Sequence, residues 1–243
     1  MTAMRIGVVL LSGGLDSTTL AVHARDETDQ LIALTLDYGQ RQRLELDAAR
    51  AVAEDLKLDH RVVDVHFYRD LAAHSALTNA DRFDLPSERD TATMAGDIPL
   101  TYVPMRNTFF LTMAAAALES EVLHRIEENG IDAAAIEPVL YIAANALDYS
   151  GYPDCRPEFY TTVAETLRLG SKIGTQYGIP FRIETPLIDK SKADIVRLAG
   201  TLAAPLELTW SCYAAGPRPC GVCDSCRLRA KGFEEARVDD PAL

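Results

Sequence analysis

Long apolar runs are absent from this sequence, and no stretch approaches the roughly 18 residues that cross a membrane. The apolar run at residues 6–11 is too short for the core of a secretory signal. It leads into Ser12-Gly13-Gly14 rather than into a small-residue cleavage pattern. We therefore expect a cytoplasmic protein with no membrane association.

Positive charge is also scarce. The chain has 24 Lys and Arg residues against 36 Asp and Glu residues, which gives a net charge of −12. Such a chain repels a phosphate backbone unless it carries a local basic patch, and no run of Lys and Arg suggests one. We expect no direct contact with nucleic acid, and we interpret the acidity as a source of solubility.

Cysteine is scarce as well: there are five in the chain, and four of them lie within fifteen residues near the C-terminus. A secreted disulfide scaffold spreads an even number of cysteines along a shorter chain, so this class is excluded. Hydrophobic residues make up 48% of the sequence and charged residues 25%, which excludes collagenous, coiled-coil and largely disordered chains. The composition is that of a globular protein with one full core.

Short apolar runs alternate with longer amphipathic segments along the chain. Continuous apolar runs are typical of strands that are covered on both faces. The runs predicted as buried strands are residues 5–11, 31–36, 60–65 and 139–144. The segments predicted as helices are residues 44–58, 107–129, 158–177 and 190–198.

This alternation predicts an α/β fold with a doubly wound, mainly parallel sheet and helices on both faces. Ligands bind beyond the carboxyl ends of the strands in such sheets, so motifs that are distant in sequence should meet there. We expect a catalytic domain at residues 1–204 and a small metal-binding element with a C-terminal tail at residues 205–243. Residues 78–101 are polar and are predicted as a long surface loop.

The hexapeptide Ser12-Gly13-Gly14-Leu15-Asp16-Ser17 follows the first predicted strand and begins a helix. Its glycines permit a tight turn, and the free N–H groups of the turn and helix start converge on one point, which suits an anion such as pyrophosphate. The Gly-Lys-[Ser/Thr] ending of a Walker loop is absent. The alternative is a plain strand–helix turn capped by Asp16 or Ser17. Beside a phosphate, Asp16 would either cap the helix or reach a bound Mg²⁺.

Four cysteines near the C-terminus have the spacing C-x7-C-x2-C-x2-C: Cys212, Cys220, Cys223 and Cys226. The x2 spacing lets neighbouring thiolates point into one tetrahedron, and four sulfurs close it without a water position. This pattern favours one structural Zn²⁺ per chain; a redox dithiol and an iron–sulfur cluster are the alternatives. The basic residues that follow, Arg227, Arg229 and Lys231, are expected to face solvent.

A third motif occupies residues 148–159 (DYSGYPDCRPEF), just past the predicted strand at residues 139–144. A guanine-like ring edge presents N–H donors, so a carboxylate is a natural partner for it, and Tyr can stack on the ring. The alternative is a polar surface loop before a helix. Cys155 is interpreted as an inert small residue.

Taken together, these motifs resemble the 7-cyano-7-deazaguanine synthase family of pyrophosphate-loop ATP-using enzymes. The resemblance covers most of the chain. Besides the hexapeptide and the four cysteines, it rests on four segments in the family's order: residues 37–41 (DYGQR), 101–107 (TYVPMRN), 148–159 and 184–187 (ETPL). The family usually has His after Gly-Gln-Arg, whereas this chain has Gln42, so the identity of a catalytic base is open.

The resemblance implies an ATP-dependent carbon–nitrogen ligase that converts 7-carboxy-7-deazaguanine and ammonia to the nitrile, with Mg²⁺ assisting and a homodimer as the assembly. The residues expected to take part in catalysis are Asp16, Ser17, Arg106 and Lys190, with Lys192 as a further cation for phosphate charge. Those expected to bind ATP are Leu11, Ser12, Gly13, Gly14, Leu15, Asp16, Ser17, Thr18, Thr19, Leu20, Tyr38, Gln40 and Arg41. Those expected to bind the acid are Asp148, Tyr152, Asp154 and Arg156.

Three other functions stay open. An enzyme with the same fold could stop at the amide. Another pyrophosphate-loop enzyme could modify tRNA, although such a ligase should carry an extra basic domain, for which a net charge of −12 leaves little room. A non-catalytic module could bind ATP without turning it over.

Overall fold

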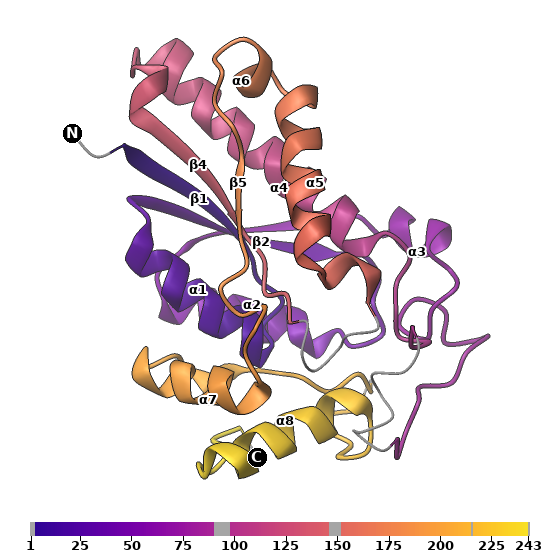
Figure 1. The fold of residues 1–243 in the computed structure, drawn as a ribbon. Helices are drawn as coiled ribbons and strands as arrows, with labels where there is room; N and C mark the ends of the chain where they lie inside the picture. The colour runs from indigo at the N-terminus through magenta and orange to yellow at the C-terminus, as the bar shows by residue number, and fades with distance from the viewer. Residues whose placement is uncertain (1–2, 90–97, 146–151, 215, 243) are drawn as a thin grey trace.

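A computed structural model describes residues 3–89, 98–145, 152–214 and 216–242 of the chain. Five strands form one sheet in the order β3-β2-β1-β4-β5, and all neighbouring pairs are parallel (Figure 1). The strands are β1 (Met4–Leu10), β2 (Gln30–Asp37), β3 (Asp59–Asp64), β4 (Ile136–Tyr141) and β5 (Arg182–Glu184). The predicted parallel α/β sheet is therefore confirmed, and four strands lie within three residues of the predicted runs.

The strand order reverses at β1. The chain proceeds from β1 to β2 and β3 on one side, and it returns to β4 and β5 on the other side. The carboxyl ends of β1 and β4 therefore form a switch point, which is where open parallel sheets bind their ligands.

Helices cover both faces of the sheet (Figure 1). One face carries α4 (Arg106–Leu123), α5 (Pro157–Gly170) and the short α6 (Lys172–Thr175). The other face carries α1 (Leu15–Glu27), α2 (Leu44–Asp55) and α7 (Lys192–Thr201). The C-terminal α8 (Asp224–Ala236) packs against α7, and the short α3 (Phe67–Leu71) follows β3. Among the described helices, none combines the length and the apolar character that crossing a membrane requires.

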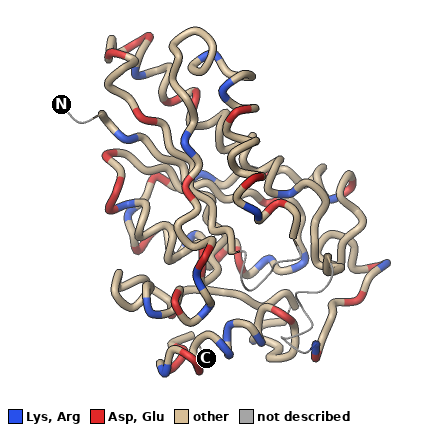
Figure 2. The backbone as a smooth tube through the Cα atoms, in the orientation of Figure 1, with Lys and Arg blue, Asp and Glu red and all other residues tan. Residues whose placement is uncertain are grey.

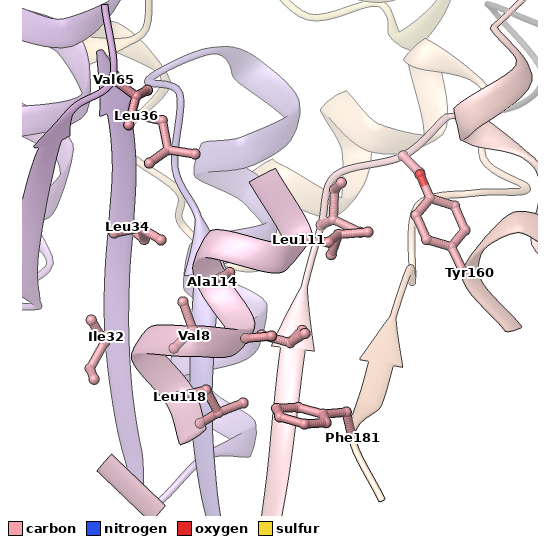
Figure 3. Packing of buried hydrophobic residues seen from close by; sticks show 14 of the residues in the cluster. Val8, Ile32, Leu34, Leu36, Val65, Leu111, Ala114, Leu118, Tyr160 and Phe181 are labelled. Atoms are coloured by element: carbon pink, nitrogen blue, oxygen red, sulfur yellow. The ribbon is translucent and has the colours of Figure 1, made fainter. Parts of the chain in front are cut away.

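The helix α4 shows how the sequence pattern builds the core. Leu111, Ala114 and Leu118 lie at helical spacing on one side of α4 and face Val8 and Leu34 of the sheet (Figure 3). All five are at most 3% exposed, so the two strands are buried from this side as their continuous apolar runs predict. A five-residue π-helical turn at His124–Glu128 then extends this helix, and Gly130 follows with a φ of +70°.

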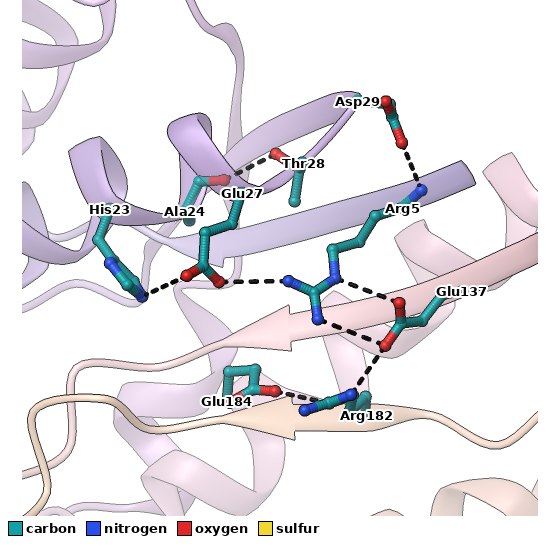
Figure 4. A network of polar contacts seen from close by, with 9 residues as sticks. All are labelled: Arg5, His23, Ala24, Glu27, Thr28, Asp29, Glu137, Arg182 and Glu184. Carbon is teal, nitrogen blue, oxygen red and sulfur yellow. Dashed lines mark hydrogen bonds and ion pairs between the residues drawn. The ribbon is translucent and has the colours of Figure 1, made fainter. Parts of the chain in front are cut away.

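A network of ion pairs ties the amino ends of the strands together (Figure 4). The Arg5 guanidinium donates to Glu137 at 3.3 Å and to Glu27 at 3.2 Å, and Arg182 donates to Glu137 at 3.0 Å. Partly exposed pairs of this kind contribute at most about 1 kcal/mol each. The network lies at the end of the sheet away from the switch point, so we regard it as structural.

Three segments differ from the sequence predictions. The helix predicted at residues 158–177 is divided at Ser171, whose hydroxyl accepts the N–H of Gly174 at 3.1 Å and begins α6. The predicted surface loop at residues 78–101 reaches the cysteine element: Glu88 donates its backbone N–H to Val222 at 3.0 Å. Helix α8 was not predicted, because its start lies inside the Pro-, Gly- and Cys-rich stretch.

Candidate active site

The loop Ser12–Ser17 lies at the carboxyl end of β1, at the switch point of the sheet. Gly13 has a φ of +79°, and a Cβ at this position would lie 2.4 Å from the amide nitrogen of Ala49 and 2.5 Å from the carbonyl oxygen of Glu45. Glycine is required here by both the backbone conformation and the space. The first turns of α2 therefore lie directly against the loop.

The loop leaves the start of α1 available to an anion. Gly14 occupies the N-cap position and has no side chain to bind the first N–H groups of the helix. The Ser17 hydroxyl accepts the backbone N–H of Ser12 at 3.2 Å and lies 3.0 Å from the Ser12 hydroxyl. Both hydroxyls thus lie beside the free N–H groups, as a phosphate cradle requires.

Asp16 lies in the first turn of α1 and does not cap the helix. Both of its oxygens accept hydrogen bonds from the Lys192 ammonium, at 2.7 and 2.9 Å, across 176 residues of sequence. Lys192 thereby offsets a negative charge beside the loop, which otherwise would repel a phosphate.

A cavity of about 300 Å³ opens beside the loop at the switch point. Four segments that lie far apart in the sequence meet there: residues 12–17, 37–41, 101–107 and 148–159. The predicted residues that line it are Leu11, Ser12, Gly14, Leu15, Asp16, Ser17, Tyr38, Gln40, Arg106 and Tyr152, with Lys192 beside them.

Several predicted site residues lie outside this lining. Thr18, Thr19 and Leu20 are fully buried within α1. Gly13 packs against the backbone of α2. The Lys190 carbonyl oxygen accepts the Asn145 amide at 2.6 Å. Arg41 lines a separate hollow with Arg69, and Arg156 is exposed at the start of α5. Asp148 lies outside the described residues.

Asp154 does not line the cavity, but it binds Asn107 in the first turn of α4. Its carboxylate accepts the backbone N–H of Asn107 at 3.2 Å, and its carbonyl oxygen accepts the Asn107 side-chain amide at 3.0 Å. Burial raises the pKa of this carboxyl group, and the Arg106 charge opposes that rise. Asp154 therefore holds the first turn of α4, which carries Arg106 into the cavity.

The Cys155 thiol and the Tyr38 phenol keep their protons at neutral pH. Burial raises the pKa of Cys155 to about 11 and the pKa of Tyr38 to about 12. A thiol with such a pKa is a poor nucleophile, which agrees with the interpretation of Cys155 as an inert residue.

Glu45 was not among the predicted site residues, and it lines the cavity from the first turn of α2. The Gln40 amide donates a hydrogen bond to its carboxylate at 2.8 Å. Burial raises the pKa of Glu45 to about 7. In the sequence, Glu45 looks like an ordinary acidic residue in the first turn of an amphipathic helix. Its closeness to residues 37–41, which follow a buried strand, is the signal that could have found it.

The expectation that Arg229 faces solvent was wrong. Arg229 is 7% exposed and forms two hydrogen bonds of 2.6 and 2.8 Å with the Asp240 carboxylate. It also donates to the hydroxyls of Thr209 and Ser211, at 2.8 and 3.0 Å. Between these two residues, Trp210 donates its backbone N–H to the Gly13 carbonyl oxygen at 2.9 Å. The C-terminal element therefore supports the loop directly.

The four cysteines form a cluster that could hold a metal ion: Cys212, Cys220, Cys223 and Cys226 have their sulfur atoms within 4.8 Å of one another. Sulfur atoms around a tetrahedral ion with bonds of about 2.3 Å lie about 3.8 Å apart, so the cluster fits such an ion with little adjustment. The backbone N–H groups of Ala214 and Cys220 both donate to the Cys212 sulfur at 3.3 Å. These bonds stabilise a thiolate, which is the form that binds a metal.

Charges of both signs are interspersed along the described chain (Figure 2). The cations at the cavity are Arg106, Lys192 and Arg229. They come from three different helices and surround one hollow, which suits a compact anionic ligand better than a long polyanion.

Comparisons with known proteins place the chain among named relatives. The family described as "Queuosine biosynthesis protein QueC" matches residues 6–237. A protein of Thermosynechococcus vestitus named 7-cyano-7-deazaguanine synthase is 45% identical over 99% of this chain and 96% of its own length. One of Thermoplasma volcanium with the same name is 45% identical over 96% of this chain and 88% of its own length.

The solved structures that match this chain are much more distant. NMN synthetase from Francisella tularensis matches with a TM-score of 0.42 and 16% identity, over 90% of this chain and 71% of its own. NH3-dependent NAD synthetase from Campylobacter jejuni matches with a TM-score of 0.37 and 13% identity, over 86% of this chain and 68% of its own. The family match spans nearly the whole chain, and so the chain belongs to the QueC family of queuosine biosynthesis proteins.

Proposed function

We propose that this protein is an ATP-dependent ligase that converts 7-carboxy-7-deazaguanine and ammonia to 7-cyano-7-deazaguanine. One observation carries the proposal. The loop Ser12–Ser17, which suits phosphates, lines the same cavity as Tyr38, Arg106 and Tyr152, which suit a flat, anionic heterocycle. Relatives that share 45% of the sequence carry the synthase name, which supports this choice of heterocycle.

The chemistry proceeds through two activations of the same carbon. The substrate carboxylate attacks the α-phosphate of ATP, and pyrophosphate leaves toward the loop Ser12–Ser17. Ammonia then forms a C–N bond with the acyl adenylate, AMP leaves, and the amide remains. The amide oxygen attacks the α-phosphate of a second ATP, and a second pyrophosphate leaves. The C–O bond then breaks, AMP departs with that oxygen, and the nitrogen loses two protons as the nitrile forms. The protein supplies positioning and charge stabilisation, because ATP supplies the leaving group.

The cations of the cavity have separate tasks in this scheme. Lys192 neutralises Asp16 beside the phosphates. Asp16 is also the carboxylate that would hold an Mg²⁺ ion bound together with ATP. Arg106 lies near the phenols of Tyr38 and Tyr152. We assign Arg106 to the carboxylate of the heterocyclic acid.

We assign one structural Zn²⁺ to the four cysteines, because four thiolates leave no coordination position for water or substrate. In this proposal, residues 1–204 form the catalytic unit and residues 205–243 form the metal element and tail. The family resemblance further implies a homodimer in the cytoplasm. A net charge of −12 supports a small-molecule substrate rather than direct contact with nucleic acid.

The test is mass spectrometry of the products formed from the carboxylic acid, ATP and ammonium. We expect the wild type to form the nitrile, with AMP and pyrophosphate, and Asp16→Ala to slow both activations. Asp26→Ala, on the exposed side of the same helix, is the matched control and should turn over like the wild type. If the wild type accumulates only amide, the protein is an amide-forming ligase; if it consumes neither acid nor amide, the proposed function is refuted.

A further inference from the structure

The proposed reaction needs a group that removes a proton from its nitrogen substrate. Ammonia in neutral solution is mostly ammonium, which has no lone pair with which to attack an acyl adenylate. Two carboxylates line the described part of the cavity, Asp16 and Glu45. Asp16 is held by the Lys192 ammonium at 2.7 Å. Glu45 is therefore the carboxylate left for another cation.

The surroundings of Glu45 fit this task. Its helix turn lies against Gly13 of the phosphate loop, so the carboxylate is close to where the acyl adenylate would form. The neutral amides of Gln40 and Gln42 donate hydrogen bonds to it. These bonds orient the carboxylate through neutral groups, and the Arg106 charge acts on the same carboxylate.

Other side chains of the lining are poor proton acceptors. No histidine lies among the described residues that line the cavity. The phenol of Tyr38 and the thiol of Cys155 keep their protons, because burial raises their pKa values to about 12 and about 11. Burial raises the pKa of Tyr152 as well. A carboxylate is the remaining group that changes charge near neutral pH.

We propose that Glu45 binds the ammonium ion in the cavity and accepts the proton that this ion loses before it attacks the acyl adenylate. This inference rests on the proposed function. In the step, an N–H bond of ammonium breaks and its proton moves to the Glu45 carboxylate. The freed lone pair of ammonia forms the C–N bond, the C–O bond to AMP breaks, and a second proton is lost to solvent as the amide forms.

The charged groups that face Glu45 set its titration. The Arg106 charge from α4 and the hydrogen bonds from Gln40 and Gln42 favour the carboxylate, whereas burial and the Asp37 carboxylate at the end of β2 disfavour it. The balance places its pKa at about 7. The ammonium-dependent rate of the wild type should thus rise through about pH 7, as the acceptor ionises.

The experiment compares two nucleophiles in the wild type, Glu45→Gln and Glu54→Gln. Hydroxylamine is largely uncharged at neutral pH and traps an acyl adenylate as the hydroxamate without needing a proton acceptor. We expect Glu45→Gln to lose a factor of about 100 or more in amide formation from ammonium at pH 7, the usual size of an acid–base contribution. Its hydroxamate formation should stay within about threefold of the wild type. Glu54, exposed on the same helix, is the matched control and should behave like the wild type in both assays.

A pH series adds a second readout. The defect of Glu45→Gln should shrink as the pH rises, because free ammonia then enters from solution. An ammonium rate in Glu45→Gln equal to that of the wild type would overturn the inference. Loss of both reactions would also overturn it, because Glu45 would then serve binding of the acid or folding. If the wild type forms no hydroxamate from the acid, the proposed function itself fails.

Discussion

Replacement of Gly13 by alanine tests whether the loop Ser12–Ser17 packs against the backbone of α2. Gly13 has a φ of +79°, and a left-handed conformation costs a non-glycine residue about 1–2 kcal/mol. The new Cβ would lie 2.4 Å from the Ala49 nitrogen and 2.5 Å from the Glu45 carbonyl oxygen, and both are backbone atoms that cannot turn aside. Overpacking of this kind costs a further ~1–3 kcal/mol. We therefore expect Gly13→Ala to lower the free energy of unfolding by about 2–5 kcal/mol.

Chemical denaturation and thermal melting measure this change. For a chain of this size, each kcal/mol corresponds to about 2–4 °C in melting temperature, so the expected fall is about 4–20 °C. Gly14→Ala is the matched control. Gly14 has a φ of −82°, and the nearest atoms to a Cβ there are the Ser12 hydroxyl at 3.5 Å and the Trp210 carbonyl oxygen at 3.6 Å. It should change stability by less than about 0.5 kcal/mol. A Gly13→Ala protein as stable as Gly14→Ala would refute the reasoning.

Three further predictions concern the elements around the loop. Lys192→Met removes the cation that offsets the Asp16 carboxylate. The carboxylate would then repel the ATP phosphates by about 1–4 kcal/mol, which should weaken ATP binding at least about fivefold in calorimetry. An unchanged affinity for ATP would contradict this role of Lys192. Asp240→Ala strands the buried Arg229 charge and should lower the free energy of unfolding by about 3 kcal/mol, so a denaturation midpoint equal to that of the wild type would count against this ion pair. Cys220→Ser should reduce metal content and melting temperature more than it reduces turnover per folded molecule, and full metal content with an unchanged melting temperature would speak against a structural ion.

The strands and the glycine turn at residues 12–17 could be predicted because their signals are local. Residues 5–11 form a continuous apolar run, and the two glycines after it predict a tight turn before a helix. The edge strand Arg182–Glu184 could not be predicted in this way, because it has three residues and both of its ends are charged. The break at Ser171 was missed as well, since it depends on the cap that its hydroxyl forms with Gly174.

The remaining site residues depend on tertiary contacts that sequence spacing does not contain. Lys192 meets Asp16 across 176 residues, because α7 packs beside α1. Arg229 follows the last cysteine, and its sequence context is typical of a solvated cation. Its burial depends on the ion pair with Asp240, which the spacing does not predict. Glu45 reaches the cavity because Gly13 lets α2 approach the loop.

A crystal structure with a methylene-bridged ATP analogue that resists cleavage between the α- and β-phosphates would show most directly whether the glycine turn binds the nucleotide. We expect the β- and γ-phosphates to lie on the N–H groups of residues 13–17, with the Ser12 and Ser17 hydroxyls within hydrogen-bond distance. Nucleotide density elsewhere, with this turn free of phosphate, would contradict the proposed chemistry.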